Sequence, residues 1–352
     1  MNPQSQSNLG AAGGWTLVEL MVAMTLGLLI IAGIDRIYLA AKHSYDLLNS
    51  MARIQDVGRY VTEQLTQDIR KAGYWGLMDM RKLGVQVPSL PPNTYYPTGI
   101  PTPPADSTCP TGNADWGRSI TRGIYGLDNL PQSSTTYACL NNRNLDGRDV
   151  LVVRYADPTP VTSFGTDSLY VRTAPYEASV VFGDPASPNP APPPPNPFLA
   201  DFVTDAIGDG GNYDYAVVAR AYYVGNSNTA RACGDPAGPL LPALLREELD
   251  SSGAPSAREL VTDVEDLQFQ YKEGSGYKNA DKVTDWSNVT AVRFWVLVRD
   301  DCPDPAYNDN NAYYLADNPA YKPNDPSCPA SDRYCRAHYR RALYSSTVAL
   351  RN

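Results

Sequence analysis

A single carboxylate stands inside an apolar segment near the start of the chain. Glu19 follows Gly14-Trp15-Thr16-Leu17-Val18 and is the one charged residue between Met1 and Ile34. A carboxylate at the centre of a bilayer costs about 2.5–3.5 kcal/mol on insertion scales, so such residues usually have a partner. Glu19 therefore indicates that another group brings a positive charge to it.

The order glycine, aromatic residue and, four positions later, glutamate resembles the processing site of type IV prepilins. In that family a dedicated peptidase cleaves after the glycine, and the new N-terminal amine is methylated. The family's glutamate pairs with the amine of a neighbouring subunit. The resemblance therefore implies cleavage after Gly14, a mature chain that begins at Trp15, and Glu19 as the assembly carboxylate.

Two simpler interpretations of this segment stay open. A secretory signal peptide would end in a small-residue site such as Tyr38–Ala41, although residues 1–14 contain no Lys or Arg and a charge inside the apolar region is atypical. The absence of a basic residue also departs from the prepilin pattern, because prepilin leaders usually carry one. A plain transmembrane anchor is the second interpretation, because Trp15–Ile34 holds 20 residues, enough to span a hydrocarbon core of about 30 Å.

Residues able to carry catalysis are sparse. The chain has two histidines, His43 and His338, and lacks the sequence patterns of zinc proteases, serine hydrolases and phosphate-binding loops. Glu265 and Asp266 are adjacent, and neighbouring strand residues point to opposite faces, which places them poorly as an acid–base pair. We therefore expect no catalytic residues, no cofactor and no enzyme activity, and rank a membrane-tethered hydrolase last.

Six cysteines predict disulfides, because an even number behind an export segment is typical of an oxidising compartment. None forms a CxxC pair, so no structural zinc site is expected. A local Cys109–Cys139 bridge and a cluster near the C-terminus are the expected pairings, with connectivity left open. The six are Cys109, Cys139, Cys233, Cys302, Cys328 and Cys335.

Composition favours an exposed, loop-rich β domain over a helical bundle. The chain of 352 residues has a net charge of −9, with 24 Tyr, 26 Gly and 31 Pro. It has no dense basic patch, so we predict no direct nucleic-acid binding.

Two insertions are expected, at residues 183–197 and 301–327. Acids in the second could ligate calcium, but their spacing is not that of an EF-hand, and no metal site is predicted; they are Asp301, Asp304, Asp309 and Asp317.

Helical periodicity continues beyond the apolar segment. An apolar stripe with steps of three, four or seven residues predicts an amphipathic helix; it consists of Leu47, Met51, Ile54, Val61, Leu65 and Ile69. Gly58 lies in the stripe and allows close packing or a bend, and Gly73 is the expected stop. The absence of proline at residues 33–37 favours one helix from Trp15 to Ala72, roughly 87 Å long at 1.5 Å per residue.

Beyond Gly73 the helical periodicity ends, and the chain becomes rich in Pro, Gly, Asn, Asp and Ser. Residues 74–148 are expected to form loops, with a short strand near 84–87, and residues 240–249 a short helix or an irregular turn. Residues 274–276 are expected to form a turn. Alternating or continuous apolar runs predict strands at residues 149–155, 169–172, 178–182, 216–224, 267–271, 291–299 and 339–350.

The segments at residues 68–76, 264–271, 292–299 and 340–352 resemble the PilW family of minor type IV pilins. The resemblance implies an α+β fold in which a long N-terminal transmembrane and spine helix is packed on a mainly antiparallel β-sheet head with long loops. It also implies a leader at residues 1–14 and a transmembrane half at 15–34. The amphipathic half would then span residues 35–73, and the head residues 74–352.

The same resemblance implies a subunit that primes pilus assembly and sits at or near the fibre tip, supporting twitching motility and adhesion. Implied partners are other minor pilins and the major pilin, prepilin peptidase, a tip adhesin and the inner membrane. The head would be periplasmic before assembly and on the fibre afterwards, although Arg36 and Lys42 oppose a simple positive-inside orientation. The alternatives are a J-type pseudopilin of type II secretion and a membrane-anchored adhesive or ligand-binding head.

Overall fold

The computed structural model describes ten stretches of the chain: residues 16–76, 123–131, 140, 145–161, 169–174, 177–182, 213–249, 255–316, 321–323 and 334–350. The chain divides into two compact units, Met1–Ala52 and Arg53–Asn352. Gly14, Trp15, the strand expected near 84–87 and the insertion at 183–197 lie outside the described residues.

One helix, α1 (Leu17–Lys71), contributes residues to both units. No break interrupts it at Gly33–Ile37, so the predicted helical continuity is confirmed. Within the first unit its large apolar side chains are exposed, among them Leu17, Leu29 and Ile30. By length and composition alone, this part of α1 is able to cross a membrane.

The second unit contains the amphipathic part of α1. Ile54, Val61, Leu65 and Ile69 are buried, as the apolar stripe predicted, whereas Met51, just inside the first unit, is 47% exposed. Gly58 confirms the prediction of close packing, because a side chain there would overlap the ring of Tyr344.

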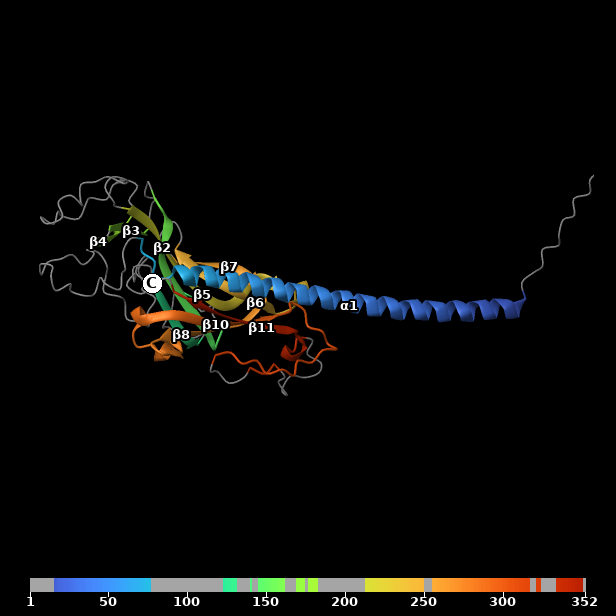
Figure 1. Cartoon of the computed structure of the whole chain (residues 1–352). Coiled ribbons are helices and arrows are strands. Elements are labelled where there is room, and N and C mark those ends of the chain that lie inside the picture. Colours follow the sequence, from blue (N-terminus) through green and yellow to red (C-terminus); the bar gives the residue numbers. More distant parts are fainter. Residues whose placement is uncertain are drawn as a thin grey trace, which may run out of the picture. The chain divides into compact units, whose positions relative to one another are not determined.

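The head is built from two antiparallel sheets (Figure 1). The seven-stranded sheet has the order β1-β2-β5-β3-β4, with β6 paired to β5 and β7 to β6. The four-stranded sheet has the order β11-β10-β8-β9. The strands of the first sheet are β1 (Ile124–Leu130), β2 (Arg148–Pro160), β3 (Leu169–Ala174), β4 (Glu177–Phe182), β5 (Tyr213–Arg231), β6 (Leu240–Leu249) and β7 (Pro255–Thr262). Those of the second are β8 (Val264–Glu273), β9 (Gly276–Lys278), β10 (Val289–Arg299) and β11 (Arg341–Ala349). The expected α+β pilin-like fold is confirmed.

The prediction for residues 240–249 was wrong. This segment is β6, paired on one side with β5 and on the other with β7. Leu, Ala, Arg and Glu give it good helix propensity, but pairing on both sides overrides that weak local preference. Three further strands, β1, β7 and β9, were not anticipated, and β1 corrects the expectation that residues 74–148 form loops, because it pairs with β2. The turn at Gly274 is confirmed: its φ of 65° is left-handed, and it joins β8 to β9.

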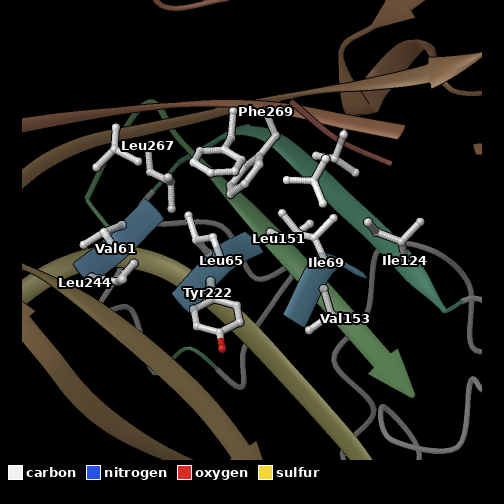
Figure 2. Packing of buried hydrophobic residues seen from close by; sticks show 14 of the residues in the cluster. Val61, Leu65, Ile69, Ile124, Leu151, Val153, Tyr222, Leu244, Leu267 and Phe269 are labelled. Atoms are coloured by element: carbon white, nitrogen blue, oxygen red, sulfur yellow. The ribbon is translucent and has the colours of Figure 1, made fainter. Parts of the chain in front are cut away.

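The main core lies where α1 meets both sheets. Figure 2 shows Val61, Leu65 and Ile69 of α1 in one cluster with Phe269 of β8 and Tyr222 of β5. A second cluster on the opposite face of the seven-stranded sheet contains apolar residues of β1, β2, β5 and β6. The helix therefore packs on residues of both sheets, which bury its apolar stripe.

One buried carboxylate fixes α1 to the seven-stranded sheet. Asp68 is 2% exposed and accepts hydrogen bonds from Tyr155 Oη at 2.9 Å and Tyr222 Oη at 2.5 Å. Arg220 Nη1 lies 2.8 Å from its Oδ2. A buried charge is tolerated where it is paired and hydrogen-bonded, and Asp68 has both kinds of partner.

The helix ends as Gly73 predicted. Gly73 has φ of 80°, a left-handed conformation that glycine adopts without strain. Its amide donates to the Arg154 carbonyl of β2 at 2.9 Å. Gly123 approaches so closely that a side chain there would overlap the Gly73 backbone. Two glycines thus join the end of α1 to the start of the sheet.

Replacing Asp68 should strongly destabilise the head. We expect Asp68→Ala to lower the free energy of unfolding by about 3–5 kcal/mol, because it leaves two buried tyrosine hydroxyls without their acceptor and takes the nearest carboxylate from the half-buried Arg220, whose other acid, Glu248, lies 3.7 Å away. Chemical denaturation of the full chain in detergent measures this. Asp56→Ala is the matched control, since Asp56 is exposed on the same helix, and equal losses in the two variants would contradict the anchoring role.

Candidate functional site

The predicted assembly carboxylate caps its own helix. Thr16 and Glu19 form a reciprocal capping box: Thr16 N donates to Glu19 Oε2 at 3.1 Å, and Glu19 N donates to Thr16 Oγ1 at 3.2 Å. The Thr16 hydroxyl also donates to Glu19 Oε2 at 3.1 Å. This motif was not anticipated from the sequence, although threonine followed three residues later by glutamate is its known signal.

The capping box decides where the negative charge lies. Glu19 is in the first turn of α1, where a carboxylate also suits the positive end of the helix dipole. Its Oε2 is bound to the amide of Thr16, the residue directly after Trp15. The carboxylate is therefore held beside the segment of chain in which cleavage after Gly14 would create a new amine.

A second polar site holds α1 where the head unit begins. Arg53 Nη2 lies 2.8 Å from Asp263 Oδ2, and Arg53 Nη1 lies 2.5 Å from Asp301 Oδ2. Asp263 has a φ of 74°, an uncommon conformation for a residue other than glycine. Burial raises the pKa of Asp263, although the charge of Arg53 opposes this effect.

A disulfide fixes one side of this pairing. Cys233 is bonded to Cys302, and the Cys233 amide donates to the Asp301 carbonyl at 3.1 Å. The bridge therefore positions the backbone of the residue that meets Arg53. This pairing was not among those expected. Cys335 is also disulfide-bonded, and the expected Cys109–Cys139 bridge and Cys328 lie outside the described residues.

The acids considered for calcium instead face arginines. Asp301 pairs with Arg53, Asp304 accepts from Arg340 at 2.9 Å, and Asp309 Oδ2 lies 3.3 Å from Arg341 Nη1. Asp317 is outside the described residues. Across the described part of the chain, no group of three metal-ligating side chains is present. In this arrangement the negative charge balances arginines inside the head.

Glu265 is the centre of the largest of these networks. It accepts from Arg341 Nε at 2.5 Å and Nη2 at 3.0 Å, and from Tyr321 Oη at 2.9 Å. Arg299 Nη1 lies 3.8 Å away. Burial alone would raise the pKa of Glu265, but the hydrogen bonds and charge of Arg341 outweigh it and lower the pKa.

The other titratable residues considered for chemistry also have structural surroundings. Asp266 accepts from the Leu267 amide and the Gln268 side chain, away from Glu265. His338 Nδ1 lies 2.8 Å from the Tyr307 carbonyl. His338 thus has a structural contact with the backbone of Tyr307. The adjacent carboxylates of Glu265 and Asp266 bind different groups, Glu265 the guanidinium of Arg341 and Asp266 the neighbouring amides.

The head carries a recognisable family pattern. Residues 221–352 match the family model of PilW, described as type IV pilus-assembly protein W. This part of the chain is similar to the PilW family. No curated protein and no solved structure matches the chain.

The PilW region runs from within β5 to the C-terminus and contains Cys233, Cys302, Glu265 and Arg341. It confirms the resemblance that residues 264–271, 292–299 and 340–352 carry. The match supports a type IV pilus-related protein, and an N-terminal apolar helix fits a membrane-anchored form of it. The family description is of an assembly protein, and it lends no support to a hydrolase.

The depressed pKa of Glu265 predicts loss of stability in acid. Its ionised form stabilises the folded head, so this contribution is full above the unfolded pKa of about 4.3 and is lost as the pH falls through the lower folded value. We expect Glu265→Gln to cost most at pH 7 and progressively less below about pH 4. Denaturation curves at stepped pH measure the difference, with exposed Glu63→Gln as control; a penalty that does not change with pH would contradict this role.

Proposed function

We propose that this protein is a minor type IV pilin, a structural subunit that primes pilus assembly and lies at or near the fibre tip. One observation carries the proposal: a PilW-family head region follows an N-terminal helix that is apolar enough to cross a membrane. In this proposal residues 1–14 are a leader, the mature chain begins at Trp15, and twitching motility and adhesion depend on the fibre.

The exposed apolar surface of α1 supplies the driving force for assembly. A helix that leaves the bilayer must bury its apolar side chains against other helices, and burial is worth about 25 cal/mol per Å² of apolar surface. This attraction is non-directional and does not by itself set the axial position of a subunit. Partner pilins in the fibre would provide the surface that replaces lipid.

Glu19 would set that axial position. In the membrane its carboxylate is bound by Thr16, and in the fibre the N-terminal amine of a neighbouring subunit would pair with it. An unpaired carboxylate at this depth is penalised, so a displaced subunit is disfavoured. A buried ion pair is better evidence for specificity than for stability. The capping box keeps the carboxylate oriented until that amine arrives.

Two alternatives are separated by cellular context. A J-type pseudopilin of type II secretion would have the same layout, but the matched family is described for pilus assembly. A membrane-anchored adhesive head would keep α1 in the lipid and would not be incorporated into fibres. Isolation of sheared pili, and of the secretion complex, with antibodies to the head would distinguish the three.

Processing should depend on Gly14. We expect Gly14→Val to block cleavage because the family's peptidase cuts after a glycine, so the protein would keep residues 1–14. Mass spectrometry of the N-terminus should find methylated Trp15 in the wild type and an intact leader in the variant. Gly10→Val is the matched control. A variant chain that still begins at Trp15 would disprove the cleavage site.

Incorporation should depend on the charge of Glu19. Glu19→Gln still accepts the Thr16 hydrogen bond but has no charge, whereas Glu19→Ala loses both. We expect both variants to insert in the membrane and to co-purify with pilins at least about tenfold less, the ratio that a loss of ~1.4 kcal/mol gives. Thr25→Val is the control within the same segment. Normal incorporation of Glu19→Gln would reduce the residue's role to helix capping.

A further inference from the structure

The last strand of the four-stranded sheet has an open edge. β11 pairs with β10 from Arg341 to Ala349 without a register shift, and within the described residues no strand pairs with its other side. Edge strands are commonly protected by proline, lysine or a bulge. β11 has none of these.

The backbone geometry identifies which groups face that edge. The Leu350 amide donates to the Thr290 carbonyl of β10 at 3.0 Å, and in an antiparallel ladder every second residue repeats this orientation. The amides and carbonyls of the alternate residues therefore point away from β10; these are Leu343, Ser345, Thr347 and Ala349. Ser345, Thr347 and Ala349 are exposed.

A groove runs beside this edge between β11 and the head part of α1. Its volume is about 590 Å³, and it is lined by Tyr344 of β11 and by polar α1 residues that include Arg59, Thr62, Thr66 and Arg70. A strand placed beside β11 would direct every second side chain toward this groove and the others toward the opposite face of the sheet.

Positive charge lies on both sides of the edge without carboxylate partners. Several arginines of the head pair with acids, as Arg53 and Arg341 do, but within the described residues Arg59, Arg70 and Arg293 form no ion pair. The acid of the groove, Glu63, accepts from Gln67 Nε2 at 3.1 Å. Arg293 lies 4.0 Å from the ring centroid of Tyr277 and opposite Thr347 across the ladder. In a chain of net charge −9, these unpaired cations favour an acidic partner.

We propose that the β11 edge binds an extended acidic segment of another polypeptide by strand addition. Main-chain hydrogen bonds would form with the free groups of Ser345 and Thr347. Acidic side chains on one face would meet Arg59 and Arg70, and those on the other would pass the small Thr347 side chain to reach Arg293. The proposal rests on the proposed function only for the source of the segment, a neighbouring subunit.

The arrangement fits a polypeptide better than a nucleic acid. Single strands bind through aromatic rings with free faces along a continuous basic track. Here Arg293 already covers a face of Tyr277, and the groove is lined by a single aromatic side chain, Tyr344. The open amides and carbonyls of β11 are complementary to another backbone, and they give the added strand a fixed register.

The backbone part of the proposal is tested with the full chain in detergent. The probe is a fluorescent peptide that repeats Glu-Glu-Thr-Thr, so that glutamates lie on both faces of the added strand, and binding is followed by anisotropy. We expect Thr347→Pro to weaken binding at least about tenfold, because proline removes an outward N–H without breaking the β10 ladder. Thr347→Ser keeps that N–H and also the hydroxyl to which Arg293 Nε donates at 3.4 Å, so it should bind like the wild type. Thermal unfolding confirms that both variants fold.

The charge part is tested with Arg293 and with other probes. Arg293→Gln should weaken peptide binding several-fold, Arg293→Lys should recover part of it, and a peptide with lysine in place of glutamate should not bind. No binding at millimolar peptide, unchanged affinity in Thr347→Pro or Arg293→Gln, or equal competition by a single-stranded oligonucleotide would each overturn the proposal. None of these results alters the processing of Gly14, so the two proposals fail separately.

Discussion

The structure of the head depends on burying one side of α1 between two sheets. Val61, Leu65 and Ile69 share one buried cluster with residues of both β-sheets. The two antiparallel sheets also meet directly, where the Phe269 amide of β8 donates to Asp149 Oδ2 of β2 at 2.7 Å, and the helix packs on both of them. The helix is therefore the central part of the fold, as well as the segment that would enter a membrane or a fibre.

Polar contacts on α1 add direction to this apolar packing. Asp68 meets three donors of the larger sheet, and Arg53 meets two acids from other segments. Apolar contact alone tolerates small shifts along a helix axis, whereas a buried charge without its partner is strongly unfavourable. A pair of such contacts, fifteen residues apart along α1, fixes both the rotation of the helix and its position along its axis.

The sequence predicted the elements with strong periodicity and failed where pairing decides the conformation. The stripe from Ile54 to Ile69 and the runs that became β2, β5, β8 and β10 carry their pattern locally, so helix and strands were foreseen. Residues 240–249 have the composition of a helix and became β6 because β5 and β7 flank them.

In the candidate site, the resemblance singled out Glu19, while its bond to Thr16 could have been found from the capping signal. The Cys233–Cys302 bridge and the Arg53 pairing join residues that are distant in sequence, and no local pattern records them.

A pilin of this kind would meet its neighbours through two physically different contacts. Burial of the apolar part of α1 is strong but carries little information on which subunit is present, since any apolar helix can supply it. Strand addition at β11 would contribute less apolar area but would require a free edge, a matching register and acidic side chains on both faces of the added strand. Specificity is a difference of affinities, so a low-abundance subunit that must be placed beside a particular partner would gain it mainly from the head. Arg59, Arg70 and Arg293, which lie beside the open edge of β11 without ion-pair partners among the described residues, would select a partner with an acidic segment.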